Sequence, residues 1–382
     1  MRVGTVREIK NHEYRVGLTP ESARELVAHG HEVWLEAGAG SGIGASDKDY
    51  EAAGAAIQPD AKTVFDGCAM IVKVKEPQPA ERAMLREGQI LYTYLHLAPD
   101  PEQTADLVRS GVTAIAYETV TGPGENGRGS LPLLKPMSQV AGRMSIQAGA
   151  TALEKAHGGR GVLLGGVPGV LPARVMVIGG GVVGFNAAQM AVGLGADVTI
   201  LDRDPEVLER LGIHFESRAK TRFSNRSNIA SMLCEAELVI GAVLVPGAAA
   251  PKLVTRDMLA CMKPGAVLVD VAIDQGGCFE TSHATTHDDP TFVIDGIVHY
   301  CVANMPGAVA RTSTYALNNV TLPHALRIAD AFEGPGGWMT AMRSDPHLAA
   351  GLNVHAGRVA HAAVARELGY DHAPVEEILG GG

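Results

Sequence analysis

A glycine-rich turn between two apolar runs is the part of this chain whose residue types and spacing most clearly indicate chemistry. The apolar run at 175–178 is followed by a helical pattern and by a second apolar run at 198–201, which ends in Asp202. The glycines of the turn are Gly179, Gly181 and Gly184. Glycines at this spacing permit a tight turn, and the helix beyond them offers free N–H groups to a pyrophosphate. Because Asp202 lies where a carboxylate can accept hydrogen bonds from an adenosine ribose, these residues predict a dinucleotide site.

Three polar side chains in the first part of the chain could act on a small polar acid. Arg15, Lys75 and His96 each follow an apolar, strand-like run. One cation can bind a carboxylate, a second polar group can position the reacting carbon, and an imidazole can move a proton as a hydride leaves. Each residue also has a structural alternative. Arg15 could pair with Glu13 at the surface, Lys75 could snorkel from the end of a buried strand, and His96 could cap its own loop.

Two acids in the second part of the chain are also candidates. Asp270 ends a buried apolar run, where it could stabilise a turn, whereas Asp274 lies farther out beside Gly276 and Gly277. Glycines allow the backbone to approach a ligand closely. We therefore favour Asp274 over Asp270 as a functional acid.

Strand and helix patterns alternate along the chain, which predicts parallel sheets covered by helices. Strands are expected at 2–6, 32–36, 70–74, 89–92, 113–116, 175–178, 198–201, 237–241 and 266–270, with a last strand at 292–294. Helices are expected at 21–29, 48–53, 79–86, 102–109, 138–157, 185–194, 315–332, 338–343 and 353–367, and the first has Thr19 as N-cap and Pro20 at its first position.

The fold class that follows is α/β, with two Rossmann-like domains built on parallel sheets. A Gly- and Pro-rich stretch at 121–135 is expected to be the linker or hinge. Only the second domain carries the phosphate-binding glycines, so the first is expected to hold the substrate. Ligands of such sheets bind at the carboxyl ends of the strands, which places the expected active site in the interdomain cleft.

Composition excludes several classes of protein. The net charge of −10 argues against nucleic acid as a partner. Apolar runs are interrupted well before 18 residues, so no membrane span is expected, and no signal-peptide pattern precedes the first strand.

The five cysteines are scattered without a CxxC pair and are expected to be free thiols in the cytoplasm. His283, His287 and Asp288 lie in one polar loop, where we predict no metal site.

Together these residues resemble the alanine dehydrogenase family, which is shared with the nucleotide-binding subunit of proton-translocating transhydrogenase. The resemblance runs from residue 1 to about 370, and its motifs are at 10–20, 74–77, 94–98, 136–142, 158–169, 269–280 and 304–319. It implies reversible oxidation of L-alanine to pyruvate and ammonium with NAD. It also implies a homohexamer and a discontinuous substrate domain, 1–135 with 310–382, around an NAD-binding domain at 136–309.

The resemblance also assigns roles to individual positions. Arg15 and Lys75 match the family's substrate-binding residues, His96 its acid/base and Asp274 its second catalytic acid. The matching cofactor-binding positions are Ser138, Gly179, Gly181, Val182, Val183, Gly184, Asp202, Ser224, Val243, Leu244, Val271, Ala272, Ile273, Asp274, Val302, Ala303, Asn304 and Met305. Asp202 favours NAD over NADP because a carboxylate repels a 2′-phosphate, although the neighbouring Arg203 weakens that preference.

Three positions depart from the family pattern. His12 replaces the usual Asn before Glu13, and Val183 replaces the usual small residue before Gly184. Some members bind a divalent ion through the helix that follows residue 319. Because Arg327 stands where the acid of that site is expected, we predict no metal there.

Two alternatives remain at this stage. One is a related dehydrogenase that aminates glyoxylate or forms opines. The other is a soluble transhydrogenase-like subunit that binds NAD(H) and needs no amino-acid site. The joint presence of Arg15, Lys75 and His96 argues against the second alternative.

Overall fold

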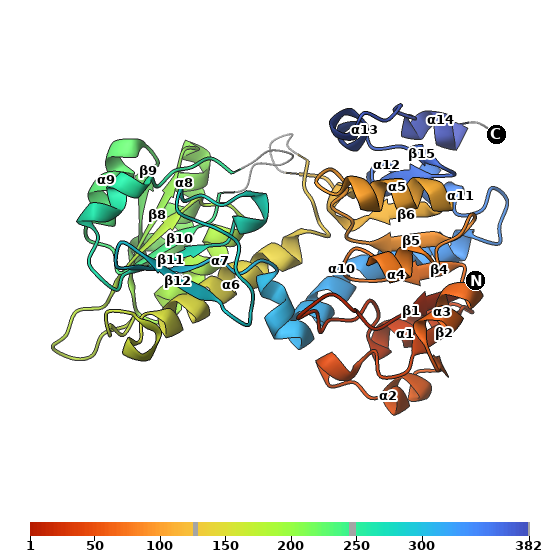
Figure 1. Ribbon diagram of the computed structural model, residues 1–382, viewed down its shortest axis with the longest axis horizontal. Helices are drawn as coiled ribbons and strands as arrows, with labels where there is room; N and C mark the ends of the chain where they lie inside the picture. Colours follow the sequence, from red (N-terminus) through yellow and green to blue (C-terminus); the bar gives the residue numbers. More distant parts are fainter. Residues whose placement is uncertain (125–128, 244–249, 381–382) are drawn as a thin grey trace. The chain divides into compact units, whose positions relative to one another are not determined.

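The computed structural model describes residues 1–124, 129–243 and 250–380, and it divides into two compact units. Unit 1 consists of Met1–Pro136 together with Gly307–Gly382, and unit 2 of Met137–Pro306 (Figure 1). Within the predicted linker, residues 125–128 lie outside the described parts. The described residues form two parallel-dominated α/β sheets, as the alternation of strand and helix patterns predicts.

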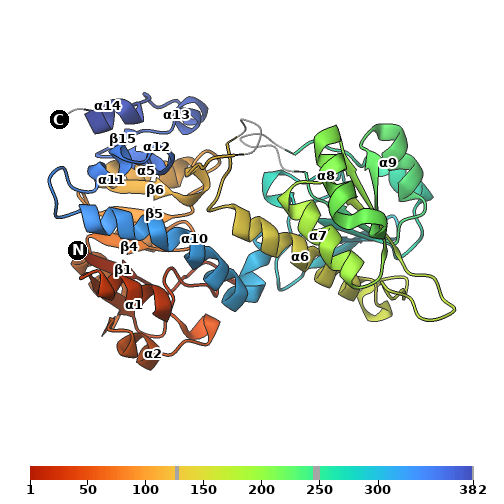
Figure 2. The ribbon, with the colours of Figure 1, turned by 180° about the vertical axis from the view of Figure 1, so that it is seen from behind.

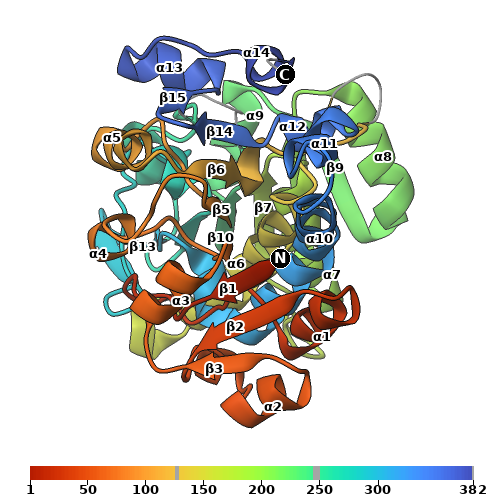
Figure 3. The ribbon, with the colours of Figure 1, turned by 90° about the vertical axis from the view of Figure 1, so that its right-hand side faces the viewer.

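Unit 1 is built on a sheet in the order β15-β14-β6-β5-β4-β1-β2-β3. Figure 3 shows the strands following one another from β15 to β3. They are β1 (Arg2–Thr5), β2 (Glu32–Glu36), β3 (Ala56–Gln58), β4 (Met70–Val72), β5 (Ile90–Thr93), β6 (Thr113–Ala116), β14 (Leu352–His355) and β15 (Arg358–Val359). β1 to β6 are parallel, and β14 adds to β6 in the antiparallel direction.

Helices cover both faces of this sheet, which explains why its central strands are continuous apolar runs. α3 (Ala61–Gly67), α4 (Pro79–Arg82) and α5 (Pro101–Ser110) lie over the face seen in Figure 1. α1 (Pro20–Ala28), α10 (Ala310–Ala331) and α11 (Met339–Arg343) lie over the face seen in Figure 2. The remaining helices are α2 (Asp47–Ala52), α12 (Pro346–Ala349), α13 (Ala362–Leu368) and α14 (Val375–Gly380).

The predicted start of α1 is confirmed, because the Thr19 side chain accepts the N–H of Ser22 and Pro20 is the first helical residue.

Unit 2 has a sheet in the order β12-β13-β11-β10-β7-β8-β9. Its strands are β7 (Arg174–Ile178), β8 (Asp197–Asp202), β9 (Ala219–Phe223), β10 (Leu238–Gly241), β11 (Val267–Asp270), β12 (Thr291–Ile294) and β13 (Ile297–Tyr300). α6 (Lys135–Ala152), α7 (Val182–Gly193) and α8 (Pro205–Phe215) cover one face (Figure 2). α9 (Arg226–Leu233) and the 3-10 helix η6 (Arg256–Cys261) supply apolar side chains to a core on these strands.

Each sheet has one point where the chain reverses its direction of travel across the strands. In unit 1 this point lies between β1 and β4, and in unit 2 between β7 and β10. Connections leave such a pair of strands toward opposite sides, which opens a crevice at their carboxyl ends. The fold therefore has one expected ligand crevice in each unit.

The structure differs from the expected elements in several places, and β3 and β9 were not expected at all. The segment at 353–367 is expected to be one helix, but it forms most of β14, all of β15 and most of α13. Ala356 and Gly357 both have positive φ, 48° and 78°, which is the geometry of a tight hairpin turn. β12 is also not the last strand of unit 2, because Asp295 and Gly296 turn the chain into β13, which pairs with β11 in parallel.

The expectation that all five cysteines are free thiols is also wrong. Cys234 caps the C-terminus of α9 and Cys261 ends η6, and the two form a disulfide with Cα atoms 4.8 Å apart. Packing of α9 against η6 brings together two residues that are 27 positions apart, which no local spacing reveals. Cys68, Cys278 and Cys301 are free and buried. No helix in the described parts of the chain is long and apolar enough to cross a membrane.

Candidate active site

Unit 1 places its three candidate residues beyond the carboxyl ends of neighbouring strands. Arg15 follows β1, Lys75 follows β4 and His96 follows β5, and these strands are adjacent in the sheet. Arg15 and Lys75 therefore lie in the segments that follow β1 and β4, the two strands at which a ligand crevice is expected. Gly17 lets the Arg15 loop pass close to β4, because a Cβ at this position would lie 2.2 Å from the carbonyl oxygen of Val72.

Arg15 is buried and held by a neighbouring carboxylate. The guanidinium donates to Glu13 through Nε (2.6 Å) and Nη2 (2.5 Å), and both side chains are almost fully buried. Burial lowers the pKa of Arg15, but the hydrogen bonds and charge of Glu13 outweigh burial and raise it overall. Arg15 thus pairs with Glu13, but the pair is buried and does not lie at the surface. Arg15 is a permanently charged, oriented fork, which suits recognition of a carboxylate.

A buried cluster of charged side chains holds the backbone next to and at Lys75. Nζ of Lys73, which is fully buried, donates to Glu8 (2.9 Å) and to Glu81 (2.7 Å). The carboxylate of Glu8 also accepts the N–H of Val74 (2.7 Å) and that of Lys75 (3.4 Å). Burial raises the pKa of Glu8, and the charge of Lys73 opposes that shift. This network holds the end of β4, so the backbone of Lys75 has a defined position.

His96 stands on a backbone conformation that is unusual for a residue other than glycine. Its φ is 53°, and its backbone N–H donates to Oε1 of Glu118 (2.6 Å). The same carboxylate accepts the N–H of Leu95, and its Oε1 lies 3.8 Å from Nδ1 of His96. The His96 ring is 45% exposed and lies parallel to the ring of Tyr94, with centroids 5.8 Å apart. The ring of His96 is therefore accessible, while its backbone is held in place by Glu118.

Tyr94 and Glu118 are residues of this site that the motif analysis missed. Charge interactions connect Tyr94 with both Arg15 and Glu118, and Tyr94 stacks on His96, so its ring is their common neighbour. Burial raises the pKa of Tyr94, whose hydroxyl donates to the carbonyl of Leu133. A positional signal could have found Glu118, since it follows β6 as His96 follows β5 and Lys75 follows β4.

Unit 2 places the glycine turn directly after β7, where a ligand crevice is expected between β7 and β10. A Cβ at Gly184 would lie 1.7 Å from the carbonyl of Gly179, so the helix can begin only with glycine at this position. At Gly181, by contrast, no atom lies within 4 Å of an added Cβ, which leaves that side open for a ligand. The first residues of α7 are Val182 and Val183, and the N-cap Gly181 supplies no side-chain acceptor for their N–H groups. This arrangement fits a pyrophosphate.

Asp202 lies at the end of β8, next to this turn. Its Oδ2 accepts the N–H of Gly180 (2.7 Å) and its Oδ1 accepts that of Asp204 (2.9 Å). Ser224 follows the adjacent strand β9 and donates its N–H to the carbonyl of Asp202. Asp202 therefore supports the glycine turn from the carboxyl end of β8.

The other predicted cofactor positions follow further strand ends of unit 2 or lie in α6. Val243 follows β10, and a Cβ at Gly179 would touch its side chain; Leu244 lies outside the described residues. Val271, Ala272, Ile273 and Asp274 follow β11, and Val302, Ala303, Asn304 and Met305 follow β13. Ser138 lies in α6. α6 packs closely on α7, because a Cβ at Gly142 would lie 2.3 Å from the carbonyl of Val183.

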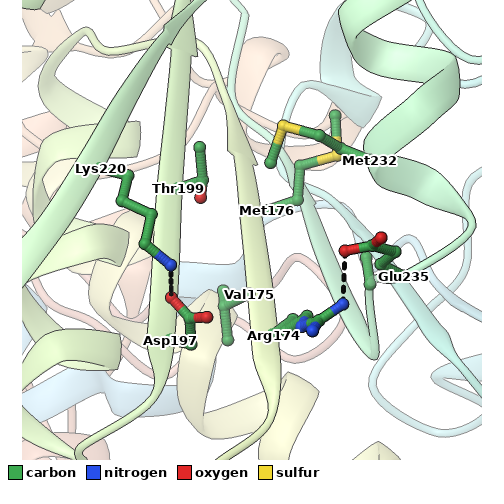
Figure 4. A pocket seen from close by; sticks show the side chains of 9 residues that line it. Arg174, Val175, Met176, Asp197, Thr199, Lys220, Met232 and Glu235 are labelled. Carbon is green, nitrogen blue, oxygen red and sulfur yellow. Dashed lines mark hydrogen bonds and ion pairs between the residues drawn. The ribbon is translucent and has the colours of Figure 1, made fainter.

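A hollow of about 180 Å³ in unit 2 lies at the amino ends of the strands, opposite to the glycine turn (Figure 4). It is lined by the first residues of β7 and β8, and its charged groups are paired, Lys220 with Asp197 and Arg174 with Glu235. It is therefore distinct from the glycine turn. In the described parts of the chain, no three His, Cys, Asp or Glu side chains are arranged to hold a metal ion.

Comparisons with known proteins agree over the whole chain. Residues 4–141 and 145–362 match the models of the N-terminal and C-terminal domains of alanine dehydrogenase/PNT. An alanine dehydrogenase of Halomonas elongata is 59% identical over 380 residues, covering 100% of both chains, and one of Bacillus subtilis is 55% identical, covering 99% of this chain and 98% of that one.

Solved structures point the same way. One L-alanine dehydrogenase superposes with a TM-score of 0.92 at 52% identity, covering 97% of this chain and 99% of the other. A transhydrogenase from Sinorhizobium meliloti superposes with a TM-score of 0.79 at 26% identity, covering 95% of this chain and all of that one. With two family models across its length and relatives above half identity, this chain belongs to the alanine dehydrogenase/PNT family.

Proposed function

We propose that the chain catalyses the reversible, NAD-dependent oxidative deamination of L-alanine to pyruvate and ammonium. The observation that carries this proposal is the placement of Arg15, Lys75 and His96 beyond three adjacent strands, in a chain that is 59% identical to an alanine dehydrogenase. A subunit that only passed hydride between nucleotides would not need this set of side chains. Unit 1 is the proposed substrate domain and unit 2 the proposed cofactor domain.

Family membership implies a nucleotide cofactor, and we propose NAD. The residues present fit it, because an added Cβ at Gly181 would meet open space, the N-terminal N–H groups of α7 suit a pyrophosphate, and Asp202 ends β8. When bound, NAD⁺ supplies the acceptor for the hydride that leaves Cα of alanine. The carboxylate of Asp202 would accept hydrogen bonds from a ribose and repel a 2′-phosphate, which favours NAD over NADP.

Side chains of unit 1 would bind and orient the amino acid. Glu13 binds the Nε and Nη2 edge of Arg15 and aligns its guanidinium, whose other N–H groups would take the substrate carboxylate. The ammonium of Lys75 would hold the second polar position. Such alignment lowers the barrier because the reacting groups no longer have to be ordered during the reaction. The matching positions in this family support these assignments.

His96 would manage the protons of the reaction. Loss of a hydride from Cα and a proton from nitrogen yields an imino acid, and addition of water gives a carbinolamine that releases ammonium and pyruvate. Because Nδ1 of His96 faces Glu118 at 3.8 Å, we assign the proton transfer to Nε2. Asp274 would orient the attacking water or the leaving amino group.

A substrate comparison tests this proposal directly. NADH formation at alkaline pH should be rapid with L-alanine and much slower with glycine, L-serine and L-lysine, and NADP⁺ should replace NAD⁺ poorly. The reverse assay with ammonium and NADH should favour pyruvate over glyoxylate. Equal rates with glyoxylate, or no activity with any amino acid, would contradict the proposed substrate. By family resemblance we also propose that the protein is cytoplasmic and that it forms a homohexamer. Sedimentation analysis can test the oligomeric state.

A further inference from the structure

The loop that follows β11 carries Asp274 and has an unusual shape. Asp274 is the middle residue of the 3-10 turn η7 (Ile273–Gln275), and Gly276 and Gly277 then reverse the chain with φ of 87° and 79°. Backbone hydrogen bonds donated by Gln275, Gly276 and Gly277 shape the turns of this loop, and further contacts attach it to its neighbours. Two ionised side chains make such contacts, from its two sides.

The first is Asp270, which is fully buried at the end of β11. Its carboxylate accepts the N–H of Cys278 (3.0 Å), the N–H of Phe279 (3.2 Å) and the hydroxyl of Ser282 (2.6 Å). A Cβ at Gly277 would lie 2.5 Å from Oδ2 of Asp270, so only glycine lets the loop pass over the carboxylate this closely. Asp270 thus ties the end of the loop back to its beginning.

The second is Lys252, which approaches the same loop through its carbonyl groups. Its Nζ donates to the carbonyls of Gly276, Gly277 (3.0 Å) and Phe279 (3.1 Å). Three carbonyls match the three donors of an ammonium group. The backbone around Lys252 runs alongside as well, since the N–H of Leu253 donates to the carbonyl of Cys278 (2.8 Å).

Lys252 is exposed, which separates its role from that of a core residue. Among the described residues, the hydrogen bonds of its Nζ go to the loop that carries Asp274. The carboxylate of Asp270 accepts N–H groups of this segment, and the ammonium of Lys252 donates to its carbonyls. Both kinds of backbone polar group in the segment are therefore held by a charged side chain. A functional side chain held this way is pre-organised by its support.

We propose that Lys252 and Asp270 are positioning residues of the reaction, which hold the loop at 271–279 so that Asp274 keeps its working orientation. The proposal rests on the proposed function through the role given there to Asp274. Neither residue is assigned contact with the substrate or the cofactor.

The first test replaces Lys252 in the full-length protein. Lys252→Met should lower kcat about tenfold, the order of loss expected when a reacting group is slightly misplaced, and leave the KM for L-alanine unchanged. Lys252→Arg keeps the charge and several donors and should recover most of the turnover. The matched control is Lys263→Met in the same unit, whose Nζ donates to the carbonyl of Glu235 and to Glu237, and it should keep wild-type turnover.

Amide exchange measures the loop directly. Exchange at the N–H groups of Cys278 and Phe279 should rise in Lys252→Met and rise further in Asp270→Asn, while the strands of unit 2 stay protected. If Asp270→Asn does not fold, the Lys252 variants alone decide the result. Unchanged exchange together with unchanged kcat in Lys252→Met overturns the proposal.

A double substitution tests whether Lys252 acts through Asp274. Adding Lys252→Met to Asp274→Ala should cost little further turnover, since residues that act as one unit are not additive. A full second loss would overturn the proposal, because Lys252 would then act elsewhere. If the wild-type protein forms no NADH with L-alanine, the proposed function fails, and the exchange data alone decide whether the two residues order the loop.

Discussion

The candidate side chains of unit 1 owe their positions to carboxylates behind them. Glu13 aligns Arg15, Glu8 holds the backbone of Lys75, and Glu118 fixes the strained turn at His96. A buried or half-buried charge is costly unless it is paired, so each carboxylate is tolerated because it accepts several hydrogen bonds. Chemistry at this edge of the sheet therefore depends on residues that would not themselves touch a substrate.

Replacing His96 tests its assignment as the acid/base. His96→Ala should lower kcat by about 10²–10⁴-fold, the usual contribution of a positioned acid/base, while NADH binding measured by fluorescence stays near wild type. Cofactor binding is the internal control, because the residues proposed to bind the nucleotide belong to unit 2. Near-normal turnover in this variant would show that another group moves the proton.

Asp202 is expected to decide between the two nicotinamide cofactors. Asp202→Asn removes the charge that repels a 2′-phosphate but keeps an oxygen that can accept the N–H of Gly180. The ratio of kcat/KM for NADP⁺ to that for NAD⁺ should rise by about tenfold or more, since one unfavourable charge contact typically costs over 1 kcal/mol. Asp202→Gly would confuse the result, because it also removes support from the turn. An unchanged ratio would show that Asp202 only supports the turn.

At the scale of elements, strand ends and helix starts carry the proposed site. β1, β4, β5 and β6 end on one edge of their sheet, and β7, β8, β10 and β11 end on one edge of theirs. The alternation of apolar runs and helical patterns predicts most of these elements correctly. It fails at 353–367, because a short hairpin and a helix both contain closely spaced apolar residues, and contact with β6 favours the hairpin.

Two glycines of the turn before α7 are expected to respond differently to the same change. Gly184→Ala should destabilise unit 2, because the added methyl would lie 1.7 Å from the carbonyl of Gly179. Gly181→Ala should leave the melting temperature unchanged but weaken NADH binding, because its Cβ would enter open space on the ligand side. Thermal melting and NADH titration of both variants check this, and equal melting temperatures would contradict the packing argument.

At the scale of the whole molecule, the chain divides into two units with separate cores. Gly307–Gly382 belongs to the unit formed by Met1–Pro136, and its strand β14 extends that sheet beyond β6. The core of unit 1 includes Val354 of β14 beside Leu91 and Ala114. Completion of this sheet therefore requires residues from both ends of the chain.

A charge placed in β14 should affect one unit more than the other. Val354→Asp buries a carboxylate among apolar side chains and should destabilise unit 1 by about 3–5 kcal/mol. Amide exchange should increase in β5 and β6 before it increases in β7 and β10. The exposed Val293→Asp in unit 2 is the control and should change neither. Equal loss of protection in both units would show that they unfold as one.

Local patterns along the chain were sufficient to predict the βα alternation, the glycine turn with Asp202, and the positions of Arg15, Lys75 and His96 after strands. Each of these depends on residues close together in sequence, whose periodicity and turn chemistry are visible without a fold. Packing in three dimensions decided the rest. It paired Cys234 with Cys261, placed Glu118 behind His96, added β14 to β6, and brought Lys252 and Asp270 to the Asp274 loop. Most of these contacts join residues that are distant in the chain, and local periodicity carries no information about such partners.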